Sequence, residues 1–385
     1  MSAEVLESFI RQKIEAHRTP GVHFTWQGGE PTLLGLDYFK QVVALQKKYA
    51  GDKQIENGFQ TNGVSLDDAW CEFFKEENFL VGLSIDGPEA IHDHYRVHRN
   101  GKGSFQEVMR ALELLKKHDV SFNTLTVVNA YNVNHADEIY DFLKDIESTF
   151  WQFIPIVERT GEEEGLATPD VSAELTEWSV PALAYGRFLE HIFQRWVRND
   201  VGTVFVQQFE SALANQMDMP AGICVWSPEC GAALAVEHNG DLYPCDHYVF
   251  PKYKLGNIME LPLVELVHAP EQQQFGKDKR EKLPQICLDC EVLDLCHGEC
   301  PKHRFIEGPD GEANHNYLCE GYKHFFTTIR PELGVLEELF SLGNPAEGIM
   351  TWMAQKDAGF PDLDVKEHDD CPCGSGEKFK SCCMK

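Results

Sequence analysis

The stretch VHFTWQGGEP, from Val22 to Pro31, is where the fold of this chain can first be read. Apolar and polar residues alternate up to Trp26, a pair of glycines follows, and residues 36–49 then have helical spacing. The same order of a short strand and then a helix recurs along the first half of the chain. It predicts strands at 22–26, 55–60, 80–85, 121–128 and 149–156, and helices at 4–17, 36–49, 66–77, 104–118 and 134–147.

Strands that alternate with helices predict an α/β fold in which a parallel sheet is connected by crossover helices. Two arrangements meet this pattern, a doubly wound sheet and a (β/α) barrel, and both place functional residues in the loops after the carboxyl ends of the strands. Ser65, Ser104 and Asn134 are the candidate N-caps of three of the helices.

Three consecutive strand ends carry small polar residues together with glycine. They read Gln27-Gly28-Gly29-Glu30-Pro31, Gln60-Thr61-Asn62-Gly63 and Ser84-Ile85-Asp86-Gly87. Glycines let a backbone approach a ligand closely, and a carboxylate beside them can accept hydrogen bonds from an amine. Ordinary turn chemistry is the alternative explanation. Arg96 could clamp a ligand carboxylate or lie on the surface as a plain charge.

The composition excludes several classes of protein. The chain has 385 residues, 43% of them hydrophobic, and a net charge of −28. Such a charge repels nucleic acid and anionic lipid, so neither is an expected partner. The sequence offers no apolar run of about 18 residues and no signal peptide, and we therefore expect a cytoplasmic protein.

The thirteen cysteines are unevenly distributed, because Cys71 is alone in the first 223 residues. Such density in a reducing compartment indicates metal or cluster ligation rather than disulfides. Eight thiols are enough for two four-iron clusters or for two zinc ions, and spacing alone does not choose between them. These eight are Cys224, Cys230, Cys245, Cys287, Cys290, Cys296, Cys300 and Cys319.

Four further thiols lie within thirteen residues at the end of the chain, at Cys371, Cys373, Cys382 and Cys383. A closed set of four thiolates predicts a structural zinc site. Cys71 lies on the apolar face of a predicted helix and is interpreted as a small buried hydrophobe. Asp246 directly follows Cys245, where a carboxylate could act as a general base beside a redox centre or be an exposed turn residue.

These motifs together resemble the radical S-adenosylmethionine (SAM) enzymes with a SPASM domain, and most closely the anaerobic sulfatase-maturating enzymes. The resemblance extends from about Met1 to Phe326, and the segment 371–385 is similar to a SEC-C zinc motif. It implies a partial (β/α)6 TIM-like barrel without its first strand over 1–200, and a cysteine-rich SPASM domain with a small β-hairpin over 201–345. A linker over 346–370 would join the zinc motif to these domains.

The resemblance also assigns roles to single residues. The cofactor SAM would be bound by Gly28, Gly29, Glu30, Gln60, Asn62, Ser84 and Arg96, with Gln27 near the substrate peptide. Cys224, Cys230, Cys245 and Cys300 would ligate one auxiliary [4Fe-4S] cluster, and Cys287, Cys290, Cys296 and Cys319 the other. Asp246 matches the catalytic base of the family. The implied reaction oxidises a sulfatase Cys or Ser to Cα-formylglycine, with electrons from a flavodoxin- or ferredoxin-type reductant.

One family feature has no counterpart here. The radical-generating cluster of the family needs a C-x3-C-x2-C loop after the first strand, and no cysteine precedes Cys71. We therefore expect that the chain as printed is inactive, and that a complete N-terminus would add the missing strand and the third [4Fe-4S] cluster. A degenerate relative that keeps only binding is the alternative to truncation. Two other functions stay open, a SPASM-type maturase of another peptide or protein and a non-catalytic zinc-rich binding protein.

Overall fold

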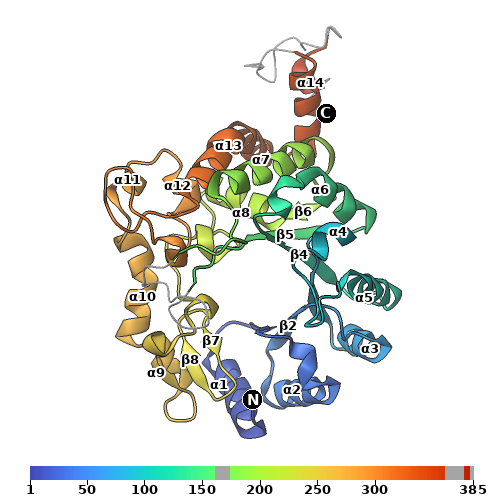
Figure 1. Ribbon diagram of the computed structural model, residues 1–385, viewed down its shortest axis with the longest axis vertical. Helices are drawn as coiled ribbons and strands as arrows, with labels where there is room; N and C mark the ends of the chain where they lie inside the picture. Colours follow the sequence, from blue (N-terminus) through green and yellow to red (C-terminus); the bar gives the residue numbers. More distant parts are fainter. Residues whose placement is uncertain (161–173, 360–376, 382–385) are drawn as a thin grey trace.

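The computed structural model describes residues 1–160, 174–359 and 377–381. Within them, the larger sheet has six parallel strands whose spatial order follows their order in the chain. They are β1 (Gly21–Trp26), β2 (Gln54–Thr61), β3 (Phe79–Ser84), β4 (Phe122–Val128), β5 (Phe150–Pro155) and β6 (Phe205–Val206). The sheet forms an open arc with helices along its outer side (Figure 1). This confirms the predicted α/β fold with a parallel, barrel-like sheet.

Five of the six helices in this part of the chain agree with the predicted ones to within a few residues, and the short helix α4 was not predicted. The six helices are α1 (Ala3–Ala16), α2 (Leu36–Tyr49), α3 (Asp68–Glu76), α4 (Glu89–His92), α5 (Phe105–Lys117) and α6 (Ala136–Asp145). Two of the three predicted N-caps are wrong. Asp67, not Ser65, caps α3 by accepting a hydrogen bond from the Trp70 amide at 3.0 Å, and α6 begins after His135 rather than Asn134. Ser104 does precede α5, but its hydroxyl donates to the Arg96 carbonyl instead of capping the helix.

The core lies between the sheet and its helices and is rich in aromatic side chains. Phe59 on β2 contacts the rings of Phe39, Trp70 and Phe74, with centroid separations of 4.9 to 5.6 Å. Cys71 is fully buried in the same layer, and its burial raises the pKa of the thiol to about 11. The prediction that Cys71 is a packing residue is therefore confirmed.

The cysteine-rich half carries a small antiparallel sheet and several short helices. The predicted hairpin is present as β7 (Ala235–Val236) and β8 (Asp241–Tyr243), and β9 (Gly256–Asn257) adds a third strand. The helical elements are η3 (Cys224–Trp226), η4 (Asp246–Tyr248), η5 (Pro251–Tyr253), α9 (Leu263–Val267), α10 (Pro270–Glu281), α11 (Gln285–Leu288), α12 (Leu293–Cys296) and η6 (Pro301–His303). No helix among the described residues has the length and apolar character needed to cross a membrane.

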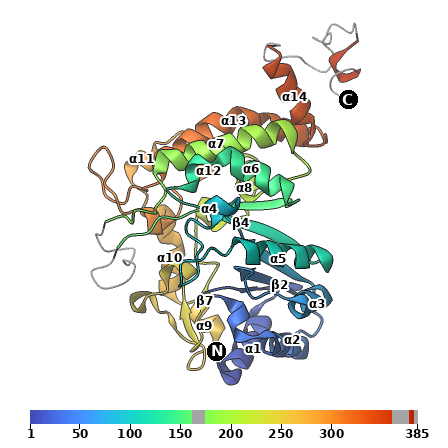
Figure 2. The same ribbon diagram turned by 45° about the vertical axis from the view of Figure 1, so that its right-hand side comes forward.

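The cysteine-rich half packs against the first half of the chain at more than one place. Helix α7 (Ala182–Asn199) packs along α13 (Cys319–Ser341), as both views of the chain show (Figures 1 and 2). At the other side, the Gln12 amide of α1 donates to the Ile258 carbonyl at 2.8 Å and accepts from the Leu263 amide at 2.6 Å.

The crossing of α7 and α13 depends on two glycines that allow the backbones to touch. A Cβ atom on Gly186 would lie 2.1 Å from the Gly321 carbonyl oxygen, and one on Gly321 would lie 2.0 Å from the Ala182 carbonyl oxygen. Helices α8 (Gln207–Gln216) and α14 (Gly348–Asp357) pack beside this pair. Helix α14 therefore occupies part of the segment 346–370, for which the sequence suggested a linker.

We expect Gly186→Ala to destabilise the protein by about 2 to 3 kcal/mol, because the added methyl group pushes two backbones apart in a packed interface. A lowered melting temperature in thermal denaturation would show this. Gly334→Ala is the matched control, because a Cβ at that position of α13 meets nothing within 4 Å. Its higher helix propensity should leave the melting temperature unchanged or raise it. Equal melting temperatures for the two variants would contradict the close-approach argument.

Candidate active site

Gln27 and Asp246 meet although 219 residues separate them in the chain. The Gln27 side-chain amide, in the loop after β1, donates to Oδ2 of Asp246 at 3.1 Å. Oδ1 of Asp246 accepts from the His247 amide at 3.0 Å and from the Cys245 thiol at 3.1 Å. Asp246 is exposed and lies on the short turn η4. The protein atoms around it oppose its ionisation, but nearby His247 and these hydrogen bonds outweigh that effect and lower the pKa of the carboxyl.

The two glycines after Gln27 leave open space in front of the backbone. Both have positive φ, 91° at Gly28 and 52° at Gly29, and a Cβ atom at either position would meet nothing within 4 Å. Glycine is favoured in this conformation, and the free space fits a ligand that approaches the main chain.

Glu30 fastens the ends of β1 and β2 to each other. Its Oε1 accepts from the Thr61 hydroxyl at 2.8 Å and from the Thr32 amide at 3.1 Å, and its Oε2 accepts from the Asn62 amide at 2.7 Å. The side-chain amide of Gln60 on β2 donates to the hydroxyl of Ser84 at the end of β3 at 3.2 Å. The predicted SAM-binding residues of three strand ends therefore lie along one edge of the sheet, as their positions in the sequence suggested.

Arg96 is already held by a carboxylate. Its Nε and Nη2 donate to Asp86 at 2.6 and 3.1 Å, and Oδ1 of Asp86 also accepts from the Val127 amide at 2.9 Å. Asp86 is 3% exposed, so this is a largely buried, two-pronged ion pair. Asp86 belongs to the motif Ser84-Ile85-Asp86-Gly87, but its role was not predicted from the sequence, because the partner of a carboxylate cannot be read from its own strand end.

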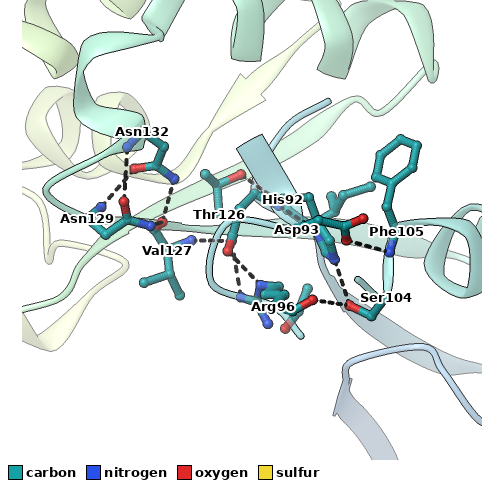
Figure 3. A network of polar contacts seen from close by, with 12 residues as sticks. His92, Asp93, Arg96, Ser104, Phe105, Thr126, Val127, Asn129 and Asn132 are labelled. Carbon is teal, nitrogen blue, oxygen red and sulfur yellow. Dashed lines mark hydrogen bonds and ion pairs between the residues drawn. The ribbon is translucent and has the colours of Figure 1, made fainter. Parts of the chain in front are cut away.

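His92 completes the network around Arg96, which Figure 3 shows from close by. Its Nδ1 accepts from the Asp86 amide at 3.3 Å, and its Nε2 lies 3.1 Å from the Ser104 hydroxyl. Burial lowers the pKa of His92 to about 4 because the imidazolium form would lose its hydration. At neutral pH a neutral ring therefore bridges the loop after β3 to the start of α5.

Four of the eight cysteines surround a single cavity of about 220 Å³. They are Cys287, Cys290, Cys296 and Cys319, the set that the family resemblance groups together. No disulfide is formed by the cysteines that the structure describes. Burial, followed by the charges of Cys287 and Cys290, raises the pKa of Cys319 to about 11, as expected for thiols that face one another without a metal. Four soft donors around one cavity fit an iron–sulfur cluster.

The other four cysteines lie on the side of Asp246. Burial raises the pKa of Cys245, and the charges of Asp246 and Cys224 act in the same direction. The pKa of the buried Cys300 is raised mainly by burial and by the charge of Glu299, and the charge of Cys245 adds to this effect. The Cys300 sulfur lies 3.7 Å from Nδ1 of His247. The mutual influence of these thiols shows that they are close together, which fits a second cluster.

The described residues lack the cysteine ligands of two further metal sites, the zinc site and the radical-generating cluster. Cys371, Cys373, Cys382 and Cys383 lie outside them. No cysteine precedes Cys71, and Cys71 is enclosed in the core, so the residues of this chain do not fit the third, radical-generating cluster.

Comparisons with known proteins agree with this geometry. The model of the radical SAM superfamily matches residues 2–143, that of an iron–sulfur cluster-binding domain (SPASM) matches 224–291, and that of the SEC-C motif matches 369–385. The fold and the site define the chain as a radical SAM enzyme with an iron–sulfur cluster-binding domain.

Its relatives identify the family within that class. A serine-type anaerobic sulfatase-maturating enzyme of Bacteroides thetaiotaomicron is 46% identical over 352 residues, which cover 90% of this chain and 85% of the relative. A cysteine-type enzyme of Clostridium perfringens is 34% identical, with 86% and 88% covered. The solved structure "Native anSMEcpe with bound AdoMet and Kp18Cys peptide" matches with a TM-score of 0.78 at 33% identity, over 88% of this chain and 91% of that one. The chain belongs to the anaerobic sulfatase-maturating enzymes. These comparisons give no support to the prediction that it is inactive.

We expect Asp86→Asn to lower both the melting temperature and the affinity for SAM, because Arg96 would lose its ionic partner. Breaking a largely buried pair costs up to about 3 kcal/mol. Thermal denaturation and calorimetric titration with SAM measure the two effects. Asp93→Asn on the same loop is the control, since Asp93 caps the Phe105 amide and makes no contact with Arg96. Unchanged SAM affinity in the Asp86 variant would show that Arg96 needs no alignment by this carboxylate.

Proposed function

We propose that the chain oxidises a serine or cysteine of a sulfatase-type peptide to Cα-formylglycine. The hydrogen bond between Gln27 and Asp246 carries this proposal, because it brings a carboxylate beside a cysteine ligand to the edge of the sheet where the SAM loops end. The higher identity to serine-type relatives, 46% against 34% for a cysteine-type one, favours serine as the first residue to test.

The residues at the strand ends would hold the cofactor. Gly28 and Gly29 would admit its methionine part, with Glu30, Gln60, Asn62 and Ser84 as polar contacts and Arg96 near the carboxylate. Bound SAM would supply the radical that abstracts a hydrogen atom from the substrate. The side chain of Glu30 already accepts four hydrogen bonds from the protein, so its main role toward the cofactor would be to fix the shape of the loop.

Asp246 would take the proton of the substrate hydroxyl or thiol. Oxidation of serine to the aldehyde removes one hydrogen atom from Cβ, one proton from oxygen and one electron. The carboxylate is held in its ionised form and can receive the proton, while Gln27 aligns its second oxygen. The electron would leave toward two auxiliary [4Fe-4S] clusters. We assign one to Cys224, Cys230, Cys245 and Cys300, and the other to Cys287, Cys290, Cys296 and Cys319.

The remaining assignments complete the proposal. A flavodoxin- or ferredoxin-type protein would be the reductant. Cys371, Cys373, Cys382 and Cys383 would bind a structural zinc ion, which the match of residues 369–385 to the SEC-C motif supports. The domain limits would be those expected from the sequence, with the helix α14 inside the segment between 346 and 370.

The substrate can be tested by mass spectrometry with the protein expressed from its own genomic locus and purified without oxygen. With SAM, a reductant and a peptide containing Ser-x-Pro-x-Arg, we expect a loss of about 2 mass units, and with the Cys-x-Pro-x-Arg peptide a loss of about 18. A peptide with alanine at the first position is the control. Formation of 5′-deoxyadenosine with no change in either peptide would contradict sulfatase maturation and favour another peptide substrate.

Asp246→Asn should suppress formylglycine formation by a factor of about 100 or more while the iron content stays the same, because asparagine cannot accept the proton. Peptide turnover and iron analysis measure the two quantities. Asp241→Asn is the control, since Asp241 lies on β8 and pairs with Lys254. Normal turnover in the Asp246 variant would remove the assigned role.

A further inference from the structure

Two cationic side chains are buried in the cysteine-rich half with no carboxylate partner. Lys279 on α10 is 0% exposed, and Arg304, just after η6, is 8% exposed. Among the residues that the structure describes, neither forms an ion pair with an acidic side chain. Buried cations are costly and are normally balanced by an anion at short range.

All hydrogen bonds of these two residues go to main-chain carbonyl groups. Lys279 Nζ donates to the carbonyls of Cys224 at 2.6 Å and Val225 at 2.8 Å. Arg304 donates through Nε to Gly298 at 2.9 Å and through Nη1 to Lys279 at 2.6 Å. Carbonyl dipoles orient the cations and replace water, but they do not supply the missing negative charge.

Among the described residues, Glu299 is the acidic side chain whose charge acts on both cations, and it already has other partners. Glu299 is 1% exposed and accepts from His303 at 2.9 Å and from Asn316 at 2.7 Å. Even a fully ionised Glu299 would offset one positive charge of the two. The described residues therefore leave an excess of buried positive charge at this place.

The position of the cations identifies the missing anion. Lys279 holds the turn that carries Cys224, and Arg304 also donates to the carbonyls of His297 and Glu299, in the segment between Cys296 and Cys300. Those two cysteines belong to different sets. Both cations therefore bind the backbone beside the proposed cluster ligands, and an anionic cluster would supply the negative charge that these cations lack.

We propose that Lys279 and Arg304 are internal counter-charges of the two auxiliary clusters and raise their reduction potentials, so that each can accept an electron from the substrate. This inference rests on the proposed ligation of the clusters. A cubane core with two positive charges and four thiolates is a dianion, and the acceptance of one electron adds a third negative charge. A fixed cation stabilises that added charge. Lys279 acts on the Cys224 set, and Arg304, which lies between the sets, acts on both.

The test is an anaerobic redox titration followed by electron paramagnetic resonance. Lys279→Gln keeps a donor for the two carbonyls but removes the charge. We expect one reduction step to move to a lower potential, with a ratio of reduced to oxidised cluster about tenfold smaller at fixed potential, or about 59 mV for one electron. Arg304→Gln should move both steps. Lys279→Arg and Arg304→Lys keep the charge and should keep the potentials close to those of the unmodified protein.

Lys282→Gln is the matched control, because Lys282 is exposed just after the end of α10 and pairs with Asp278. It should leave both potentials unchanged. Iron and sulfide analysis tests the cluster ligation separately from the counter-charge role. An unmodified protein without about eight iron atoms would contradict the assignment of two clusters. Unchanged potentials in a neutral variant that retains its iron would overturn the counter-charge role. A neutral variant that folds by circular dichroism but loses its iron, while the charge-retaining variant keeps it, would support that role.

Discussion

The contact between the backbones of α7 and α13 is the constraint on which the site depends. Gly186 and Gly321 let the two helices approach until main chain meets main chain, which fixes the cysteine-rich half against the large sheet. The Gln12 amide fastens the opposite side through Ile258 and Leu263. The bond from Gln27 to Asp246 joins the same two halves, across 219 residues of the chain.

The sequence predicted the part of the fold that repeats. Alternating strands and helices with periodic apolar residues gave five of the six strands, because each buries a face that is visible in the order of its residues. Strand β6 was missed because two residues, Phe205 and Val206, are too short to show any period. Helix α14 was missed for a different reason. Its buried side chains, Ile349 and Met353, are too few to stand out in a polar stretch, and the surface of α7 supplies the rest of the interface.

The site was predictable where its residues carry their own chemistry and was not where they depend on partners. Glycines at a strand end and thiols at short spacings are informative alone, and their positions in the structure fit the expected ligands. Asp86 and Lys279 show the limit of such reasoning. An aspartate before a glycine looks like a turn, and a lysine in KDKR looks like a solvated surface, until the fold buries the first against Arg96 and the second beneath Cys224. The division of eight cysteines into two sets likewise came from resemblance and not from spacing.

Asp246 and Cys245 are joined by one peptide bond, so the transfer of a proton and the transfer of an electron would take place next to each other in the site. If Cys245 ligates a cluster, the proton acceptor and the electron acceptor cannot move apart, because η4 holds the carboxylate on the Cys245 side through the His247 amide. A negative charge that grows on the cluster also makes the neighbouring carboxylate easier to protonate. The proton and the electron of the substrate would then move to neighbouring groups. Their opposite charges would compensate each other, so no net charge would accumulate there. In a chain with a net charge of −28, that pairing would keep a further negative charge from building up at the site.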